Sequence, residues 1–315
     1  MRALVVDPGL SFKADYPDPH PPNESLVRVS LAGICGTDLE ITRGYMNYRG
    51  IPGHEFVGRV IQTDDAKLAG KRVVGEINAA CGHCSFCHAG LGRHCAERTV
   101  LGIKGRNGTF AEYLALPSEN LLIVPDSVPD EAAVFTEPLA AAYEIFEQLR
   151  IGPDKSIVVL GDGRLGAMVA LAFKAEGHQP IVAGHHREKL DRLTALGLST
   201  AVEQDLTGSY DYVVDCTGHG NGLMRAIELV KPRGTIVLKS TAAAGAALNL
   251  APVVINEITV VGSRCGRFAP ALAALESGKL DLRPLIDGTF SLEDGPRAME
   301  TATRSSNFKI LLKPS

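Results

Sequence analysis

Short apolar runs, some continuous and some alternating with polar residues, are separated by Gly, Pro and Asn-Gly along the first part of the chain. Runs of this length that are bounded by turn-forming residues are typical of β-strands. They predict four strands, at residues 25–32, 55–62, 71–75 and 109–116. The chain from residue 25 to residue 122 is therefore expected to form an irregular β-rich domain.

The pattern changes near Pro129. An alanine-rich amphipathic stretch over residues 130–149 begins with two acidic residues and is followed by Gly152 and Pro153, which predicts a helix that joins two domains. Beyond it, apolar runs alternate with stretches that are compatible with helices. The runs cover residues 156–160, 180–183, 200–203, 211–215, 235–239 and 258–262. This alternation predicts a doubly wound parallel sheet, and with it the α/β class.

The last part of the chain has a helical pattern over residues 269–277 and ends in an apolar run at residues 309–312. We expect it to return to the first domain. The predicted organisation is a β-rich catalytic domain of residues 1–148 with 266–315, and a dinucleotide-binding domain of residues 149–265. The length of 315 residues agrees with two domains of roughly 150 residues each.

Composition and charge exclude several classes of partner. Apolar residues make up 45% of the chain and charged residues 22%, and the net charge of −4 does not favour nucleic acid or an anionic membrane. The apolar run at the amino terminus is too short for a secretory signal, and no run approaches the ~18 residues of a membrane span. These features predict a cytoplasmic protein without a nucleic-acid or membrane partner.

Four of the seven cysteines crowd into one short segment. They are Cys81, Cys84, Cys87 and Cys95. In a reducing compartment such crowding favours metal binding over disulfides. Four thiolates can surround one tetrahedral Zn²⁺, and because a closed shell leaves no open position, the predicted role of this zinc is structural. Three neighbouring histidines are alternative ligands, namely His83, His88 and His94.

A glycine-rich segment follows the first predicted strand of the second domain. It reads Gly161, Asp162, Gly163, Arg164, Leu165 and Gly166, and an apolar-periodic helix follows. A position between strand and helix is the context that a pyrophosphate site needs. The first glycine permits a tight turn, the second lets the backbone approach the diphosphate, and the third allows close packing of the helix on the strand. The segment predicts dinucleotide binding.

Two further motifs combine a thiol, an imidazole and carboxylates. Cys35 is followed by Thr37 and Asp38, and His54 by Glu55. Taken alone, Cys35 is also compatible with a small buried apolar residue, and His54 with a loop histidine that binds nothing. Together with the four cysteines and the glycine-rich turn, in this order, the motifs resemble the zinc-containing medium-chain alcohol dehydrogenases. The resemblance covers nearly the whole chain and implies that the first domain is GroES-like.

The resemblance also implies a catalytic zinc. Cys35 and His54 match two of the family's zinc ligands, and Glu137 matches the acidic third ligand of its polyol and secondary-alcohol branches. Three protein ligands leave the fourth position open for substrate. Such a zinc acts as a Lewis acid on the alcohol oxygen while hydride passes to the nicotinamide. The resemblance thus implies one catalytic and one structural zinc per chain.

Four residues near these ligands match polar positions of the same family. Glu55, also compatible with a surface glutamate, resembles the carboxylate that can approach the metal during ligand exchange. Asp38 resembles the acid that orients the ligand histidine. Thr37 matches the hydroxyl that passes on the alcohol proton. Glu40 stands where many members carry a relay histidine, so the outer step of the proton path stays open between this carboxylate and water.

The cofactor choice depends on the end of the second strand of the sheet, where an acid would bind the ribose hydroxyls of NAD. The chain has Gly184 there, followed by His185, His186 and Arg187. Because no carboxylate at that position repels a 2′-phosphate and Arg187 can bind it, the segment resembles the members that use NADP. Arg187 is also compatible with a solvated first turn of the next helix, with NAD bound less specifically. An aspartate at position 184 is expected to shift the preference toward NAD.

The resulting hypothesis is a zinc-dependent dehydrogenase that transfers hydride between an alcohol, such as a secondary alcohol, polyol or aldose, and NADP in preference to NAD. Thr217, after a later strand, matches the family's cofactor-flanking turn. A homodimer or homotetramer is expected. Two alternatives stay open: a zinc-independent quinone or enone reductase of the same fold, and a non-catalytic protein that senses a dinucleotide. The set of zinc ligands argues against the first alternative.

Overall fold

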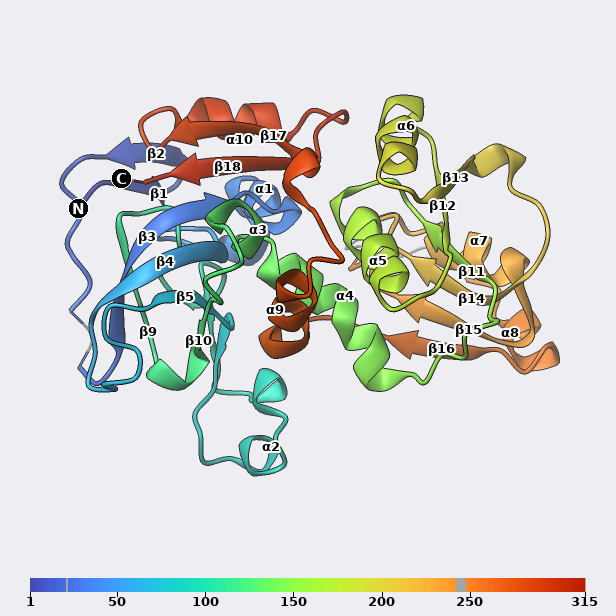
Figure 1. Ribbon diagram of the computed structural model, residues 1–315, viewed down its shortest axis with the longest axis horizontal. Coiled ribbons are helices and arrows are strands. Elements are labelled where there is room, and N and C mark those ends of the chain that lie inside the picture. Colours follow the sequence, from blue (N-terminus) through green and yellow to red (C-terminus); the bar gives the residue numbers. More distant parts are fainter. Residues whose placement is uncertain (21, 242–247, 315) are drawn as a thin grey trace. The chain divides into compact units, whose positions relative to one another are not determined.

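The computed structural model describes residues 1–20, 22–241 and 248–314. Within it the chain forms two compact units, Met1–Glu137 with Phe268–Ser315, and Pro138–Arg267 (Figure 1). The first division lies at the start of helix α4 (Thr136–Gln148), earlier than the predicted boundary at residue 148. The reason is that α4 is bound into the second unit, where the Ala141 carbonyl accepts a hydrogen bond of 2.6 Å from Lys239 Nζ.

The first unit is built on a seven-stranded sheet. Its order is β10-β5-β4-β3-β18-β17, and β9 also pairs with β3. The strands are β3 (Ser25–Gly33), β4 (Glu55–Gln62), β5 (Arg72–Gly75), β9 (Tyr113–Leu116), β10 (Leu121–Ile123), β17 (Ile286–Ser291) and β18 (Lys309–Lys313). Because β18 pairs with β3, the end of the chain belongs to this unit.

Shorter elements accompany this sheet. The additional strands are β1 (Ala3–Val6), which pairs with β2 (Leu10–Lys13), and β6 (Asn78–Ala79), β7 (Thr99–Leu101) and β8 (Gly105–Arg106), which form a small sheet. The helices are α1 (Gly36–Thr42), α2 (Ser85–His88), α3 (Asp130–Ala133), α9 (Phe268–Glu276) and α10 (Gly295–Ala302). In Figure 1, α2 lies in a loop that extends away from the strands of this unit.

Three of the four strands predicted for this unit are present over nearly the predicted residues. The fourth, expected over residues 109–116, begins only at Tyr113. The first part of that run bonds to a loop instead, since the Thr109 N–H donates to the Gly53 carbonyl at 3.0 Å and the Phe110 N–H to the Pro52 carbonyl at 3.1 Å. This run therefore supports the segment that carries His54.

The helix predicted over residues 130–149 is divided in two. α3 ends at Ala133 and α4 begins at Thr136. Pro138 explains the division, because it has no N–H to bond to the carbonyl four residues earlier and is tolerated only in the first turn of a helix. The break places Glu137 in the first turn of a new helix.

The second unit is a six-stranded parallel sheet with the order β13-β12-β11-β14-β15-β16, the doubly wound arrangement that the sequence predicted. Its strands are β11 (Ile157–Leu160), β12 (Ile181–Gly184), β13 (Ser199–Val202), β14 (Tyr210–Asp215), β15 (Val230–Leu238) and β16 (Thr259–Gly262). Besides α4, its helices are α5 (Arg164–Ala175), α6 (Arg187–Ala195), α7 (Gly222–Leu229) and α8 (Ala251–Ile255).

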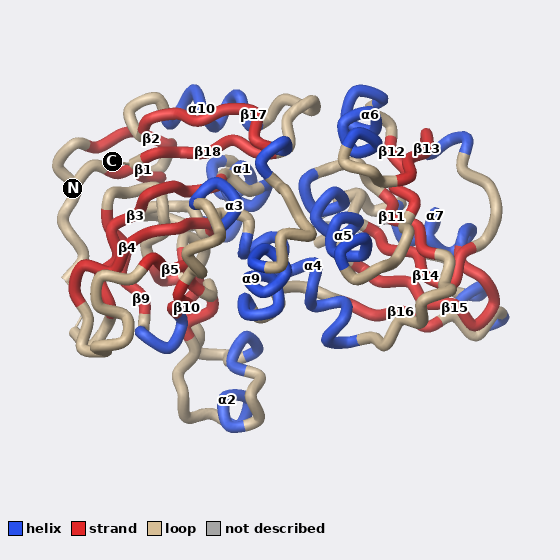
Figure 2. Tube along the Cα trace, in the orientation of Figure 1, coloured by secondary structure: helices blue, strands red, loops and turns tan. Residues whose placement is uncertain are grey.

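An α-helix follows each strand of this unit up to β15 except β13, and Figure 2 distinguishes these helices from the strands by colour. The central strand β11 is buried over its whole length, which explains its unbroken apolar sequence. The predicted α/β class is confirmed. No helix in the described ranges combines the length and the apolar character needed to cross a membrane.

Candidate functional site

Asp38 joins the two segments that carry the predicted zinc ligands. It lies in the first turn of α1, fully buried, and its Oδ2 accepts a hydrogen bond of 2.8 Å from the Cys35 N–H. Its Oδ1 accepts a hydrogen bond of 3.1 Å from the Gly53 N–H and lies 3.2 Å from His54 Nδ1. An acid in the first helical turn that bonds back to the N-cap residue stabilises the start of a helix. Here the same acid also fixes Cys35 and His54 relative to each other.

Cys35, His54 and Glu55 each present one ligand atom within 4.8 Å of the others. We call these three residues the Cys35 cluster. His54 and Glu55 are buried, and Cys35 is half-buried. With Nδ1 facing Asp38, Nε2 is the ring atom of His54 that is available to a metal. Thiolate, imidazole and carboxylate are a donor set that zinc accepts, so the residues present fit this ion.

The charges around the cluster favour a cation. Burial lowers the pKa of His54, but the Asp38 carboxylate outweighs burial, and the pKa lies well above its ordinary value. Burial raises the pKa of Glu137; His54 and Lys309 oppose this shift, while Glu55 and Asp38 add to it. Three carboxylates thus act on one another beside one imidazole and one ammonium group. A divalent cation would balance their charge.

Glu137, the predicted third ligand, is half-buried in the first turn of α4. It lies near enough to His54 and Glu55 for their charges to affect its pKa, yet the group of atoms within 4.8 Å contains Glu55 instead. The structure therefore offers two carboxylates near the metal position, one inside the Cys35 cluster and one beside it. Sequence reasoning identifies Glu137 only through the family resemblance.

A buried lysine that sequence reasoning missed holds Glu55. Lys309, the first residue of β18, is 3% exposed and forms an ion pair with Glu55 Oε2, and its Nζ lies 5.5 Å from the centre of the Phe135 ring. Among the described residues, Glu55 Oε1 is buried without a hydrogen-bond partner. Because an unpaired buried carboxylate oxygen is costly, a cation would also satisfy this atom. The available signal was a lysine directly before the apolar run at residues 310–312.

Thr37 and Glu40, the residues of the predicted proton path, lie on α1 in different surroundings. Thr37 is half-buried, and its Oγ1 lies 4.0 Å from Cys35 Sγ. The Glu40 side chain is 57% exposed and accepts a hydrogen bond of 2.7 Å from Arg43. Thr37 is therefore next to a predicted ligand, whereas Glu40 is held at the surface in an ion pair of the kind that contributes little in water.

The four cysteines of the 81–95 segment converge on one point, and we call this segment the cysteine lobe. Their sulfur atoms all lie within 4.8 Å of one another, with 3.5 Å between Cys84 and Cys87 and 3.9 Å between Cys81 and Cys87. Zinc–sulfur bonds of about 2.3 Å in a tetrahedron place two sulfurs about 3.8 Å apart, so this spacing fits a zinc ion. A backbone N–H, that of Cys81, lowers the pKa of the Cys95 thiol to about 6, which favours the thiolate that zinc binds.

The histidines of the lobe do not share this convergence. All three are exposed, namely His83, His88 and His94. His83 forms a second group of possible ligand atoms with Cys81 and Glu97, but two of these three residues are exposed. The thiols are therefore the better donor set of the lobe.

The glycine-rich turn connects β11 to α5. Gly161 has a φ of +109°, and a Cβ on Gly166 would lie 1.9 Å from the Gly161 carbonyl oxygen, so both positions require glycine. A Cβ on Gly163, the N-cap residue of α5, would meet nothing within 4 Å. The backbone there is open to a phosphate at the start of the helix. Arg164 and Leu165 are half-buried in its first turn.

The turn after β14 packs against this glycine-rich turn. A Cβ on Gly161 would lie 2.7 Å from the Cys216 carbonyl oxygen. The adjacent Thr217 donates from its hydroxyl to Asp215 Oδ1 at 2.7 Å. The structure thus brings the backbone of Thr217 next to the glycine-rich segment, and its contact with the cofactor stays a prediction.

The end of β12 differs from the expectation. A Cβ on Gly184 would lie 2.3 Å from Asp162 Oδ2, so a side chain fits there only if Asp162 moves. A Gly184→Asp change is therefore not the simple switch toward NAD that the sequence suggested. The basic residues that follow, His185, His186 and Arg187, are all exposed.

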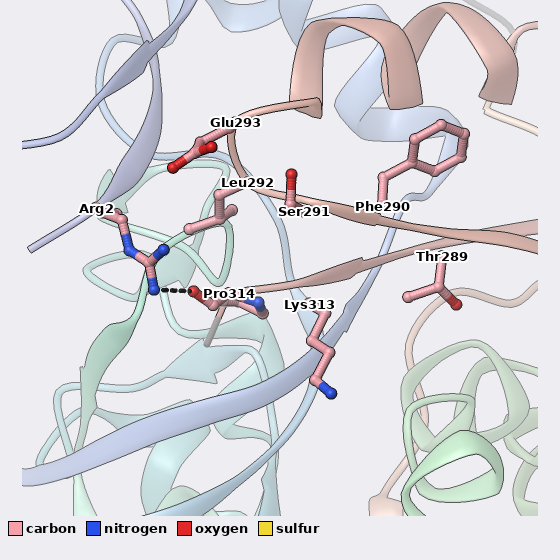
Figure 3. Close-up of a pocket in the computed structure, with 8 residues that line it drawn as sticks. All are labelled: Arg2, Thr289, Phe290, Ser291, Leu292, Glu293, Lys313 and Pro314. Carbon is pink, nitrogen blue, oxygen red and sulfur yellow. Dashed lines mark hydrogen bonds between the residues drawn. The ribbon is translucent and has the colours of Figure 1, made fainter.

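A cavity of about 320 Å³ lies elsewhere in the first unit, between the two ends of the chain. Figure 3 shows its lining, in which Arg2 donates a hydrogen bond of 3.1 Å to the Pro314 carbonyl. The lining residues are Arg2, Thr289, Phe290, Ser291, Leu292, Glu293, Lys313 and Pro314. None of them is a predicted site residue, and we assign no function to this cavity.

Two family models match the chain, the alcohol dehydrogenase GroES-like domain over residues 21–126 and the zinc-binding dehydrogenase domain over residues 165–277. The first match confirms the expected GroES-like domain. An L-threonine 3-dehydrogenase from Chelativorans sp. is 30% identical, with 87% of this chain and 86% of that protein covered. A sorbitol dehydrogenase from Halalkalibacterium halodurans is 28% identical over the whole of this chain and 99% of its own length.

Among solved structures, an alcohol dehydrogenase from Escherichia coli CFT073 in complex with NADH is similar, with a TM-score of 0.91 and 25% identity. The match covers 100% of this chain and 99% of that one. These matches agree with the motifs in their order and with the two units described above. The chain therefore belongs to the zinc-type medium-chain alcohol dehydrogenases, oxidoreductases that act on CH–OH groups.

Proposed function

We propose that this protein oxidises a secondary alcohol, polyol or aldose with NADP, using one catalytic zinc in the Cys35 cluster and one structural zinc in the cysteine lobe. The observation that carries the proposal is the buried arrangement around Asp38, which holds Cys35 and His54 next to a carboxylate with an unpaired oxygen. The relatives named for sorbitol and L-threonine support a substrate with a hydroxyl on a secondary carbon.

The chain's own residues have separate tasks in this reaction. When bound, zinc would lower the pKa of the alcohol oxygen as a Lewis acid, and the nicotinamide would accept hydride. Cys35, His54 and a carboxylate, Glu137 or Glu55, would hold the metal. Asp38 orients His54 through Nδ1. Thr37 Oγ1, beside the Cys35 sulfur, would take up the alcohol proton and pass it outward to water or Glu40.

The preference for NADP rests on the end of β12. No side chain is present at Gly184 to bind the ribose hydroxyls, and the exposed Arg187 can pair with a 2′-phosphate. The NADH in the Escherichia coli relative belongs to that protein and does not decide the choice here.

We further propose that the chain forms a homodimer or homotetramer. Support comes from the edge strand β16 and the neighbouring α8, which leave Val254 and Ile255 77% and 76% exposed and Val260 41% exposed. Apolar side chains gathered at a sheet edge favour pairing with another chain. All seven cysteines are free thiols, which supports a reducing compartment such as the cytoplasm.

The test is an assay of secondary alcohols, polyols and aldoses with NADP and with NAD, together with zinc analysis of the same preparation. We expect turnover of at least one of these classes, a higher kcat/KM with NADP, and two zinc ions per chain. A metal-replete protein that turns over none of these substrates would refute the proposed activity. A tenfold preference for NAD, about 1.4 kcal/mol, would refute the cofactor choice alone.

A further inference from the structure

Asp162, the second residue of the glycine-rich turn, is bonded to the segment that follows β12. Its Oδ2 accepts hydrogen bonds from the His185 and His186 N–H groups at 2.8 and 2.7 Å. Its Oδ1 lies 3.0 Å from His186 Nδ1. The residue is 6% exposed. One carboxylate thus fixes the backbone of two successive residues on a neighbouring strand end.

The same side chain explains why residue 184 is glycine. The nearest atoms to a Cβ on Gly184 would be Oδ2, Cβ and Cγ of Asp162, at 2.3, 2.4 and 2.5 Å. An acid at the end of the second strand would begin at this point, and Asp162 fills the space. In this chain the carboxylate therefore comes from the glycine-rich turn, and it leaves no room for a side chain at the strand end.

The Asp162 carboxylate interacts with groups of the protein itself. Burial raises its pKa, but the His186 N–H and imidazole, together with the charge of Lys189, outweigh burial and hold the pKa below its ordinary value, so the group is ionised at neutral pH. Its oxygens accept the donors of the 185–186 segment. What the segment presents to solvent are the side chains of His185, His186 and Arg187, the last in the first turn of α6.

We propose that Asp162 is a positioning residue that raises the affinity of the site for adenosine ligands with a 2′-phosphate relative to the same ligands without it. It fixes the start of α6, and thereby Arg187, where a 2′-phosphate can be bound, and its charge is compensated by N–H groups so that it does not repel this phosphate. The inference rests on the nicotinamide dependence of the proposed function. It concerns the change in the ratio of affinities for 2′,5′-ADP and 5′-AMP when Asp162 is altered. It does not depend on the value of this ratio in the unaltered protein.

The test is calorimetric binding of 2′,5′-ADP and 5′-AMP to the whole protein, which needs no turnover. A charge-assisted bond to a phosphate corresponds to at least about tenfold in affinity. We therefore expect Asp162→Ala to weaken 2′,5′-ADP about tenfold or more and to change 5′-AMP by less than about threefold. Arg187→Ala should have the same effect, and the double variant should lose no more than Arg187→Ala alone, because Asp162 acts through Arg187.

Two further variants separate geometry from charge. Asp162→Asn keeps an oxygen for the His185 and His186 N–H groups and should retain the preference. Asp162→Glu keeps the charge but is too long for the space beside Gly184, and it should lose the preference even if Asp162→Ala does not fold. The matched control is Asp211→Asn, since Asp211 also accepts a backbone N–H, that of Ser156 at 3.0 Å, but at the amino ends of the central strands β11 and β14. In this control variant the ratio of the affinities for 2′,5′-ADP and 5′-AMP should not change.

Three results would overturn the inference. Tighter binding of 2′,5′-ADP by Asp162→Ala or Asp162→Asn would mean that the carboxylate repels the phosphate. Equal weakening of both ligands would mean that Asp162 only supports the fold. A full additional loss in the double variant would mean that Asp162 does not act through Arg187. Equal affinities of the unaltered protein for both ligands would instead refute the NADP preference, and the change caused by Asp162→Ala would still decide the inference.

Discussion

The cysteine lobe and the Cys35 cluster offer similar donor atoms, but they are assembled in different ways. The lobe takes all its thiols from one segment, and its regular structure is limited to α2 and the short turn Gly92–His94. The cluster takes Cys35 from the segment that follows β3 and His54 from the residue before β4, and His54 is buried together with Asp38. Sequence proximity builds the first group, whereas sheet pairing builds the second.

This difference determines what each group needs in order to be ordered. In the lobe, the large side chains Phe86 and Leu91 are 48% and 39% exposed, so little apolar burial holds the segment. A loop of this kind depends on its metal. In the cluster, Asp38 accepts hydrogen bonds from the backbone N–H groups of Cys35 and Gly53, and Lys309 forms an ion pair with the Glu55 side chain. Loss of metal should therefore disorder the lobe and leave the fold around the cluster intact.

The largest effect is expected from Cys35→Ser. We expect kcat/KM to fall at least about a thousandfold, or about 4 kcal/mol, because the reacting oxygen loses its Lewis acid. About one zinc per chain should be lost, with a change in melting temperature below about 4 °C. Elemental analysis, activity and calorimetry check these values. Cys265→Ser is the matched control and should keep both zinc ions. Full activity in Cys35→Ser would refute the catalytic role of the Cys35 cluster.

Lys309→Met tests whether the protein's own charges hold the cluster. Removing one partner of a buried ion pair leaves the other charge unpaired, which costs about 3 kcal/mol in unfolding free energy. The double variant Glu55→Gln with Lys309→Met should recover most of this loss, since no unpaired charge remains. Urea unfolding checks both. Lys13→Met, at an exposed lysine of β2, is the control, and an equal effect of the two lysine variants would contradict the prediction.

Cys95→Ser tests the dependence of the lobe on its metal. Loss of one thiolate opens the closed shell, and we expect amide hydrogen exchange over residues 81–95 to become about a hundredfold faster, or about 2.7 kcal/mol. The strands β3 and β4 should keep their protection. Hydrogen-exchange mass spectrometry checks this pattern. Unchanged exchange in the lobe after loss of its zinc would show that the lobe is held by other contacts.

The smallest effects concern the proposed proton path. Only the Cys35 cluster needs such a path, because the cysteine lobe would leave no position open for substrate. Thr37→Ala should lower kcat about tenfold or more, and Glu40→Gln about threefold or less, because Glu40 is exposed and paired with Arg43. Zinc content should not change in either variant. Rates measured at saturating substrate with a deuterium isotope effect check that hydride transfer is observed. A larger loss in Glu40→Gln than in Thr37→Ala would reverse the assignment.

Local signals account for the parts that the sequence predicted. The strands of the second unit, the cysteine lobe and the glycine-rich turn depend on neighbouring residues, and the sequence contains these directly. The ion pair of Glu55 with Lys309 depends on register, since Gly33 of β3 is paired with Glu55 on one side and Leu311 on the other. Similarly, Asp162 excludes a side chain at Gly184 only because β11 and β12 are neighbours. The pattern of apolar and polar residues along the chain does not predict such contacts, because they join residues that are far apart in the sequence.

The position of Lys309 also has a consequence for biosynthesis. A ribosome releases the chain from its amino terminus, so Cys35, His54 and Asp38 can come together early. Glu55 acquires its partner only after 254 further residues, when β18 joins β3. Until then the nascent first unit holds a carboxylate without its counter-charge beside an unfilled position in its sheet. The arrival of β18 therefore joins β17 to β3 and neutralises the buried carboxylate in one step.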